Sequence, residues 1–98
     1  MLDDSTPVAK LRNVGQVTAS KLCEVGVLNL GDLKTIGADA AFERILVLAR
    51  RDRTMHSVSV NLLYALWGAI HDVDWRDLPE DKKTDLRELA TRLRGEIG

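Results

Sequence analysis

The chain has 98 residues, of which 45% are hydrophobic and 30% are charged, and its formal net charge is −1. This composition is typical of a folded globular protein rather than a disordered chain, and the length predicts one domain over residues 1–98, with a core over about residues 8–80. The small net charge excludes a strongly basic nucleic-acid-binding protein but permits a local basic patch.

One short phrase occurs three times near the start of the chain: Leu, two variable residues, a β-branched apolar residue and Gly. The copies are Leu11–Gly15, Leu22–Gly26 and Leu33–Gly37. The Leu and the residue three positions later share a helix face, and Gly is the residue that most easily closes a helix in the left-handed conformation. The repeat therefore predicts short helices that end or turn at these glycines, at least two of which should have a positive φ.

Capping residues and helical spacing predict the elements along the chain. Thr6 followed by Pro7 is typical of a helix start, and Asn29 and either Ser57 or Ser59 are candidate N-caps further along. The predicted helices cover residues 7–13, 16–25, 30–35, about 38–49, 60–70 and 79–97. Because no segment alternates polar and apolar residues for long, the sequence predicts an all-α fold, a compact bundle of five to six helices.

The last two predicted helices differ in how they distribute apolar residues. The segment over residues 60–70 is apolar on nearly all sides, so we expect it to be the central helix. The segment over residues 79–97 has one narrow apolar stripe, formed by Leu86, Leu89, Leu93 and Ile97. Such a stripe suits packing along one other helix. We expect it to dock against Tyr64 and Trp67, with pairing to a second copy in a homodimer as the alternative.

The segment Leu11–Leu22 resembles a helix-hairpin-helix motif, in which Asn13-Val14-Gly15 stands at the Gly-hydrophobic-Gly core. Asn tolerates the left-handed region better than most residues, so the hairpin geometry survives the replacement. The resemblance implies phosphate binding by the backbone N–H groups that begin the next helix. The candidate DNA-backbone-binding residues are Gly15, Gln16, Thr18 and Lys21. The residues alone favour a simpler alternative, in which Gly15 only closes a turn and Lys21 is a solvated surface residue.

Two further groups of residues are candidates for binding. Arg50, Arg51 and Arg53 form a secondary basic patch at a helix end, although Asp52 dilutes it and a solvated loop is the simpler interpretation. Tyr64, Trp67 and Trp75 are either packed in the core or form a partner-binding patch, because Tyr and Trp are enriched at interface hot spots.

The sequence shows no sign of catalysis, a metal site or a cofactor. No phosphate loop, dinucleotide-binding phrase or nucleophile motif occurs, and the single Cys23 excludes an internal disulfide and a cysteine-based zinc site. No apolar run reaches the ~18 residues that a membrane span requires. We therefore expect a cytoplasmic protein that is not an enzyme and has no membrane partner.

Five phrases, in order, resemble the C-terminal domain of the TfoX/Sxy family. They are Leu11–Gly15, Glu24–Val27, Asp32–Ala38, Asn61–Ala69 and Trp75–Pro79. The resemblance implies a compact helical domain, and family members are linked to natural competence for DNA uptake as co-activators that work with the catabolite activator protein. The family's N-terminal domain has no counterpart here, so we expect a stand-alone relative or a domain cut from a longer protein.

Three functions remain open from the sequence. The first is a non-catalytic regulatory domain that acts through protein contacts, with the transcription machinery as a candidate partner. The second is weak, sequence-independent binding of the DNA backbone through the Asn13-Val14-Gly15 hairpin. The third is a structural dimerisation module.

Overall fold

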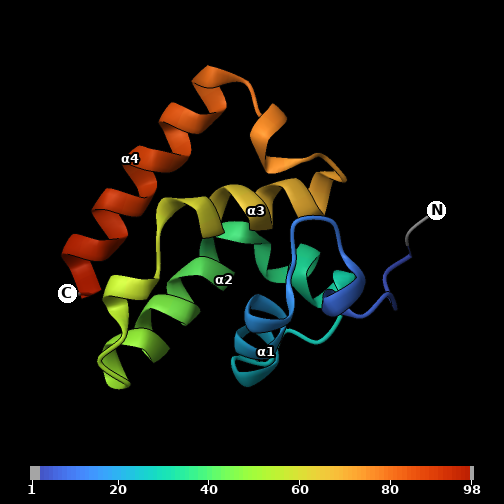
Figure 1. The fold of residues 1–98 in the computed structure, drawn as a ribbon, viewed down its shortest axis with the longest axis horizontal. Helices are drawn as coiled ribbons and strands as arrows, with labels where there is room; N and C mark the ends of the chain where they lie inside the picture. The colour runs from blue at the N-terminus through green and yellow to red at the C-terminus, as the bar shows by residue number, and fades with distance from the viewer. Residues whose placement is uncertain (1–2, 98) are drawn as a thin grey trace.

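The computed structural model describes residues 3–97, so the first two residues and the last residue of the predicted domain lie outside the description. The described part is all-α, with four α-helices and no strand. The α-helices are α1 (Gln16–Glu24), α2 (Leu30–Arg51), α3 (Val60–His71) and α4 (Glu80–Ile97). Short 3-10 helices cover Val8–Lys10, Met55–Ser57 and Trp75–Asp77. In Figure 1, α3 crosses the middle of the molecule and α4 descends along one side of it.

The expected helix over residues 7–13 is only a 3-10 turn, and Thr6 does not cap it. Pro7 is the N-cap residue, and the Thr6 hydroxyl instead accepts a hydrogen bond from the Asp3 N–H at 3.2 Å. The backbone around Pro7 pairs with the segment before α2, because Val8 N–H donates to Leu28 O at 3.1 Å and Leu30 N–H donates to Thr6 O at 2.9 Å. This pairing fixes the backbone that enters the turn. The turn stops at Leu11, which is extended with a φ of −78° and a ψ of 148°, just before the left-handed Asn13.

The expected third and fourth helices form one element, α2, which Asn29 caps by accepting from Asp32 N–H at 2.8 Å. α2 is interrupted at Gly37, whose φ of 86° and ψ of 161° are not helical. The structure therefore does not confirm the predicted five to six helices, nor the helix-hairpin-helix character, because the element before α1 is only a 3-10 turn. It does place the interruption at the glycine that the repeat identifies.

Two of the three repeat glycines have a positive φ, as predicted: Gly26 at 87° and Gly37 at 86°. Gly26 ends α1 in a Schellman motif, in which its own N–H donates to Cys23 O at 3.1 Å and Val27 N–H donates to Leu22 O at 2.8 Å. Gly15 has a φ of −86° and precedes α1. The left-handed residue of the first copy is Asn13 instead, with a φ of 71°.

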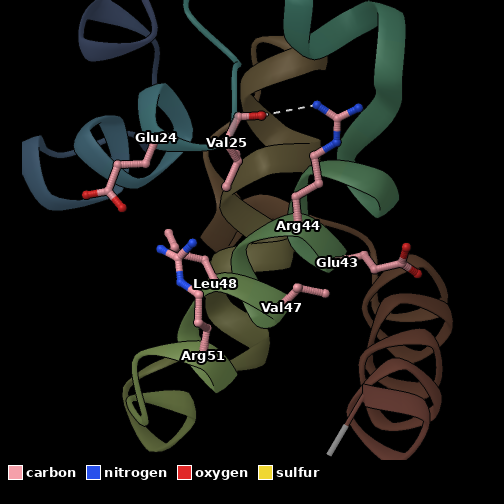
Figure 2. A pocket seen from close by; sticks show the side chains of 7 residues that line it. All are labelled: Glu24, Val25, Glu43, Arg44, Val47, Leu48 and Arg51. Carbon is pink, nitrogen blue, oxygen red and sulfur yellow. Dashed lines mark hydrogen bonds between the residues drawn. The ribbon is translucent and has the colours of Figure 1, made fainter.

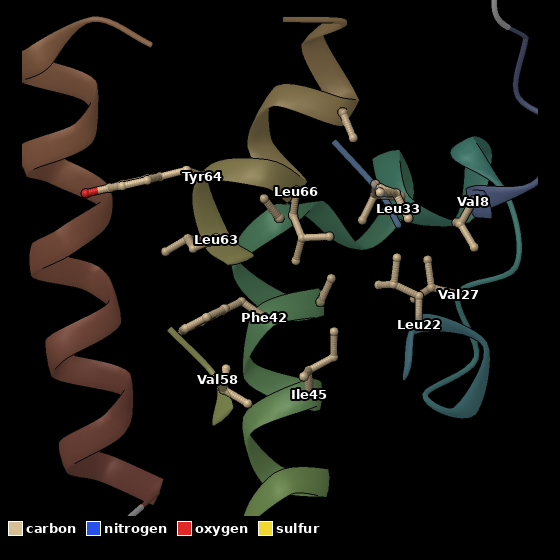
Figure 3. Close-up of a cluster of buried hydrophobic side chains, with 14 of the residues drawn as sticks. Val8, Leu22, Val27, Leu33, Phe42, Ile45, Val58, Leu63, Tyr64 and Leu66 are labelled. Carbon is tan, nitrogen blue, oxygen red and sulfur yellow. The ribbon is translucent and has the colours of Figure 1, made fainter. Parts of the chain in front are cut away.

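One hydrophobic cluster receives side chains from all four α-helices. Its largest fully buried members are Phe42, Leu22, Leu33, Ile45, Leu46, Leu63, Leu66, Val8 and Val27. Figure 3 shows how α2 and α3 supply the centre of this cluster, while α1 and the N-terminal segment close one end. The position of α3 agrees with the prediction of a central apolar helix.

α4 docks on its own chain, which was the first of the two arrangements expected for it. Leu86, Ala90 and Leu93 are buried in the common core. The Tyr64 hydroxyl donates to the Lys83 carbonyl at 3.4 Å, and the Lys82 ammonium lies 5.2 Å from the centre of the Trp67 ring. The apolar stripe of α4 is therefore used within the chain.

We expect Gly26→Ala to lower the free energy of unfolding by about 1 kcal/mol, because alanine is strained at a left-handed position. The added methyl group meets no atom within 4 Å, so any loss reports backbone strain rather than a clash. Gly95→Ala is the matched control: it also meets nothing within 4 Å, but it lies inside α4. It should be neutral or stabilise the protein by up to about 1 kcal/mol. Urea unfolding measures both, and equal effects would contradict the left-handed assignment.

Candidate functional site

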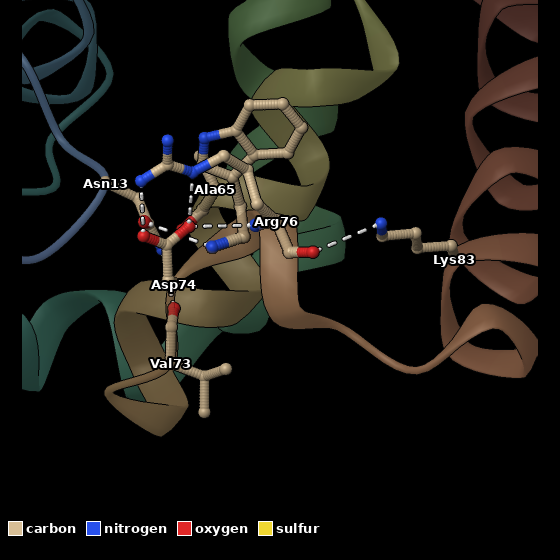
Figure 4. A network of polar contacts seen from close by, with 7 residues as sticks. Asn13, Ala65, Val73, Asp74, Arg76 and Lys83 are labelled. Carbon is tan, nitrogen blue, oxygen red and sulfur yellow. Dashed lines mark hydrogen bonds and ion pairs between the residues drawn. The ribbon is translucent and has the colours of Figure 1, made fainter.

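Asn13 joins the hairpin before α1 to α3 and to the turn that follows α3 (Figure 4). Its side-chain amide donates to the carbonyls of Val73 at 2.8 Å and Ala65 at 3.4 Å, and its side-chain oxygen accepts from Trp75 N–H at 3.2 Å. Gly68 allows this close approach, since a Cβ there would collide with the Val73 carbonyl oxygen and the Asn13 amide. The hairpin is therefore held at a fixed position on α3.

The turn that carries Trp75 is stiffened by a carboxylate and a guanidinium. Asp74 caps the 3-10 helix by accepting from Arg76 N–H at 2.9 Å, and its carboxylate also accepts from the Arg76 side chain at 2.8 and 3.1 Å. These hydrogen bonds, the side-chain ones first, hold the pKa of the Asp74 carboxyl well below its usual range. The turn thus presents Trp75 next to the hairpin in one conformation.

A groove of about 310 Å³ lies between α1 and the first half of α3, and we call it the α1–α3 groove. Its lining residues are Val17, Thr18, Lys21, Ser57, Val58, Ser59, Asn61, Leu62, Ala65 and Trp75. Lys21 is the only charged residue in this lining, and the polar remainder consists of hydroxyl and amide side chains. Val17 is 71% exposed at its edge. The groove combines apolar surface with one positive charge.

The structure brings together only part of the predicted DNA-binding set. Thr18 and Lys21 line the α1–α3 groove, whereas Gly15 and Gln16 are exposed beside it. Gly15 is the N-cap of α1, no side chain caps this helix, and its first turn carries no acidic residue. The amino end of α1 therefore presents backbone N–H groups and a helix dipole without a competing carboxylate.

The three aromatic candidates have different surroundings. Tyr64 is buried, and its ring stacks on Trp75 with the centroids 6.4 Å apart. Trp75 is partly exposed and lines the α1–α3 groove. Trp67 is also partly exposed, but its ring lies 3.9 Å from that of His71, near α4. Tyr64 thus has the core position expected from packing, and only Trp75 joins the groove that contains Lys21.

The arginine candidates lie elsewhere, at and beyond the end of α2. Arg50, Arg51 and Arg53 are all exposed, and the Arg51 side chain pairs with Asp52 at 3.4 Å. Arg51 also lines a second depression of about 580 Å³, the α1–α2 groove, which Figure 2 shows. The residues that line it are Glu24, Val25, Glu43, Arg44, Val47, Leu48 and Arg51.

Sequence reasoning missed the side of the α1–α3 groove that comes from the segment before α3. Ser57 and Ser59 were considered only as helix caps, and Ser59 does cap α3 by accepting from Asn61 N–H at 3.2 Å. Nothing local in the sequence says that these residues face Lys21. Within residues 3–97, no group of three or more His, Cys, Asp or Glu side chains is placed to hold a metal ion. No helix of that part of the chain is long and apolar enough to cross a membrane.

Comparison with known proteins identifies relatives of nearly the whole chain. The model of the TfoX C-terminal domain family matches residues 4–90. A crystal structure of an uncharacterized protein from Listeria monocytogenes, in a triclinic form, is 33% identical with a TM-score of 0.79, covering 92% of this chain and 96% of that one. A tetragonal form of a Listeria monocytogenes protein of unknown function is 34% identical with a TM-score of 0.75, covering 87% and 98%. No curated protein matches this chain.

We expect Asn13→Ala to lower the free energy of unfolding by about 2–3 kcal/mol, because it removes the hydrogen bonds that join three segments and places alanine at a left-handed position. Asn13→Gly keeps the backbone conformation and loses only the side-chain bonds, so its loss should be smaller. Urea unfolding of both variants separates the two contributions. A stability of Asn13→Ala equal to that of the wild type would show that the network is dispensable.

Proposed function

The chain belongs to the TfoX C-terminal domain family, and we propose that it is a non-catalytic regulatory domain that acts in transcription control, such as the control of natural competence, by binding a protein partner. The family assignment supports a regulatory role, and the surface supports binding rather than chemistry.

The exposed side chain of Val17, in the lining that also contains Trp75, is the observation that carries this proposal. A tryptophan edge and an aliphatic side chain at the rim of a groove form the apolar centre that protein interfaces use. Lys21 lies in the same lining and favours a partner segment that carries an acidic residue next to its apolar one. The backbone of the turn that carries Trp75 is anchored, because Asn13 accepts from the Trp75 N–H and Asp74 pairs with Arg76 on either side of it.

Val17→Glu tests this proposal. Glutamate in the first turn of α1 is favourable for the helix, so the variant should stay folded while it opposes an acidic partner and removes the apolar rim. We expect the immobilised wild-type domain to capture a defined protein from nuclease-treated host extract, and Val17→Glu to lose it.

Leu28→Glu is the matched control, because Leu28 is 56% exposed and lies outside the groove. It should capture the same protein as the wild type. Capture that depends on intact nucleic acid, or equal capture by all three proteins, would argue against a protein site in this groove.

A second function, weak binding of the DNA backbone, is favoured by one specific observation: the amino end of α1 lacks both a side-chain cap and an acidic residue, and Lys21 follows one turn later. Such a site would bind phosphate through N–H groups and the helix dipole. Its contacts would carry no sequence information. The net charge of −1 provides little long-range attraction, so the affinity would be low.

If the domain binds duplex DNA, the affinity should be the same for unrelated sequences and should fall steeply with salt. Lys21→Glu should abolish the binding, and changes at Arg50 or Arg51 should matter less, because these residues lie away from α1's amino end. Fluorescence anisotropy over a salt series measures this. Tight binding to one particular sequence that survives Lys21→Glu would refute the site.

A further inference from the structure

Three large hydrophobic side chains are exposed among residues 3–97: Val17, Leu28 and Val47. Val47 is 54% exposed and lies within α2, in the lining of the α1–α2 groove. This groove shares no lining residue with the α1–α3 groove. A single exposed apolar residue is ordinary on a protein surface. Whether Val47 indicates a binding surface therefore depends on the charged residues around it.

Glu43 and Arg51 stand four residues before and four residues after Val47. In an α-helix this spacing places the three side chains on one ridge, with each charge about 6 Å along the axis from the valine. Figure 2 shows the three side chains following one another along α2, on the lining of the groove. The ridge therefore carries a negative end, an apolar centre and a positive end.

A second ridge of the same sequence, running in the opposite direction, has charges complementary to those of the first. If a second copy of α2 packs antiparallel about a two-fold axis at Val47, Val47 meets its equivalent, and Glu43 faces the partner's Arg51 at both ends. Interfaces with two-fold symmetry must be self-complementary in this way. Helices most often pack with such i±4 ridges of each helix lying in the grooves of the other. A partner surface whose charges all have the same sign would be repelled at one end of the ridge.

The rest of the groove fits the same occupant. Val25 and Leu48 add apolar surface, and Glu24 and Arg44 add one charge of each sign, so the lining contains two carboxylates and two guanidiniums. Arg44 is held in place because it donates to Val25 O at 3.1 Å.

The surface pair between Arg51 and Asp52 does not prevent this contact, because both side chains are largely exposed and such pairs contribute little. The apolar stripe of α4 is already buried in its own chain. The ridge on α2, in contrast, is exposed at Val47.

We propose that this chain forms a homodimer in which α2 packs antiparallel against α2 of the partner, centred on Val47, with Glu43 of each chain paired to the partner's Arg51. The interface is small, so the dimer is weak and depends on concentration. The proposal does not rest on the regulatory function proposed above, since it concerns a different surface.

Charge reversal tests the proposal on the full chain. Sedimentation equilibrium over micromolar to millimolar concentrations should show a monomer–dimer equilibrium for the wild type. Glu43→Arg and Arg51→Glu each place like charges opposite one another, so each should weaken self-association by at least about tenfold. The double variant E43R/R51E restores opposite charges and should recover the wild-type dimer. Arg50→Glu makes the same change of charge at an exposed residue outside the groove lining, and should leave the equilibrium unchanged.

A mixture of the two single variants is the most specific measurement. In a mixed dimer, two cations of one chain face two carboxylates of the other, so the mixture should associate more tightly than either variant alone. A wild-type chain that stays monomeric throughout the concentration range would overturn the proposal. So would a dimer that the single variants do not weaken, or one that neither the double variant nor the mixture restores.

Discussion

One carboxamide joins three separate segments of the chain. The Asn13 side chain contacts the middle of α3, Val73 just beyond the end of α3 and the turn that carries Trp75, with all three of its hydrogen bonds made to backbone groups. Because these partners are backbone atoms, they fix the path of the chain rather than the identity of side chains. The network also requires the absence of a side chain at Gly68, so the hairpin and α3 fit each other through one polar residue and one missing methyl group.

The features that the sequence predicts correctly are those set by local chemistry. Asn29 and Ser59 cap helices because their side-chain oxygens reach an N–H two or three residues away, a geometry that needs no other part of the chain. Gly26 closes α1 for an equally local reason, its positive φ. The errors arise where distant segments compete. The helix expected over residues 7–13 is only a short turn because Leu11 is extended and Asn13 is left-handed, and Asn13 is bonded to residues about sixty positions later, which no local pattern reports.

For the candidate sites, too, the sequence predicts individual residues but not how distant segments meet. Thr18 and Lys21 were identified from the hairpin resemblance, and Trp75 from its residue type, but their meeting in one groove depends on how α1 lies against α3. The α2 ridge escaped the sequence reasoning for a different reason. Helical periodicity identifies buried faces, and Val47 lies off the buried face of α2. The sequence does contain a signal here, an apolar residue outside the buried stripe with opposite charges four residues on either side. Only the observed exposure of Val47 shows that this pattern lies on the surface.

The Asn13 network also sets an order of events during synthesis. The amide of Asn13 and the carbonyl of Val73 are separated by 60 residues, and its oxygen and the Trp75 N–H by 62. A chain that emerges from the ribosome with its amino end first exposes the hairpin long before the groups that complete it exist. The backbone hydrogen bonds within α1 are local, but its placement on α3 must wait for loop closure over most of the chain. The segment before α1 is therefore synthesised early but reaches its final packing late. A ligand of the α1–α3 groove meets a complete site only after residues up to Trp75 have folded.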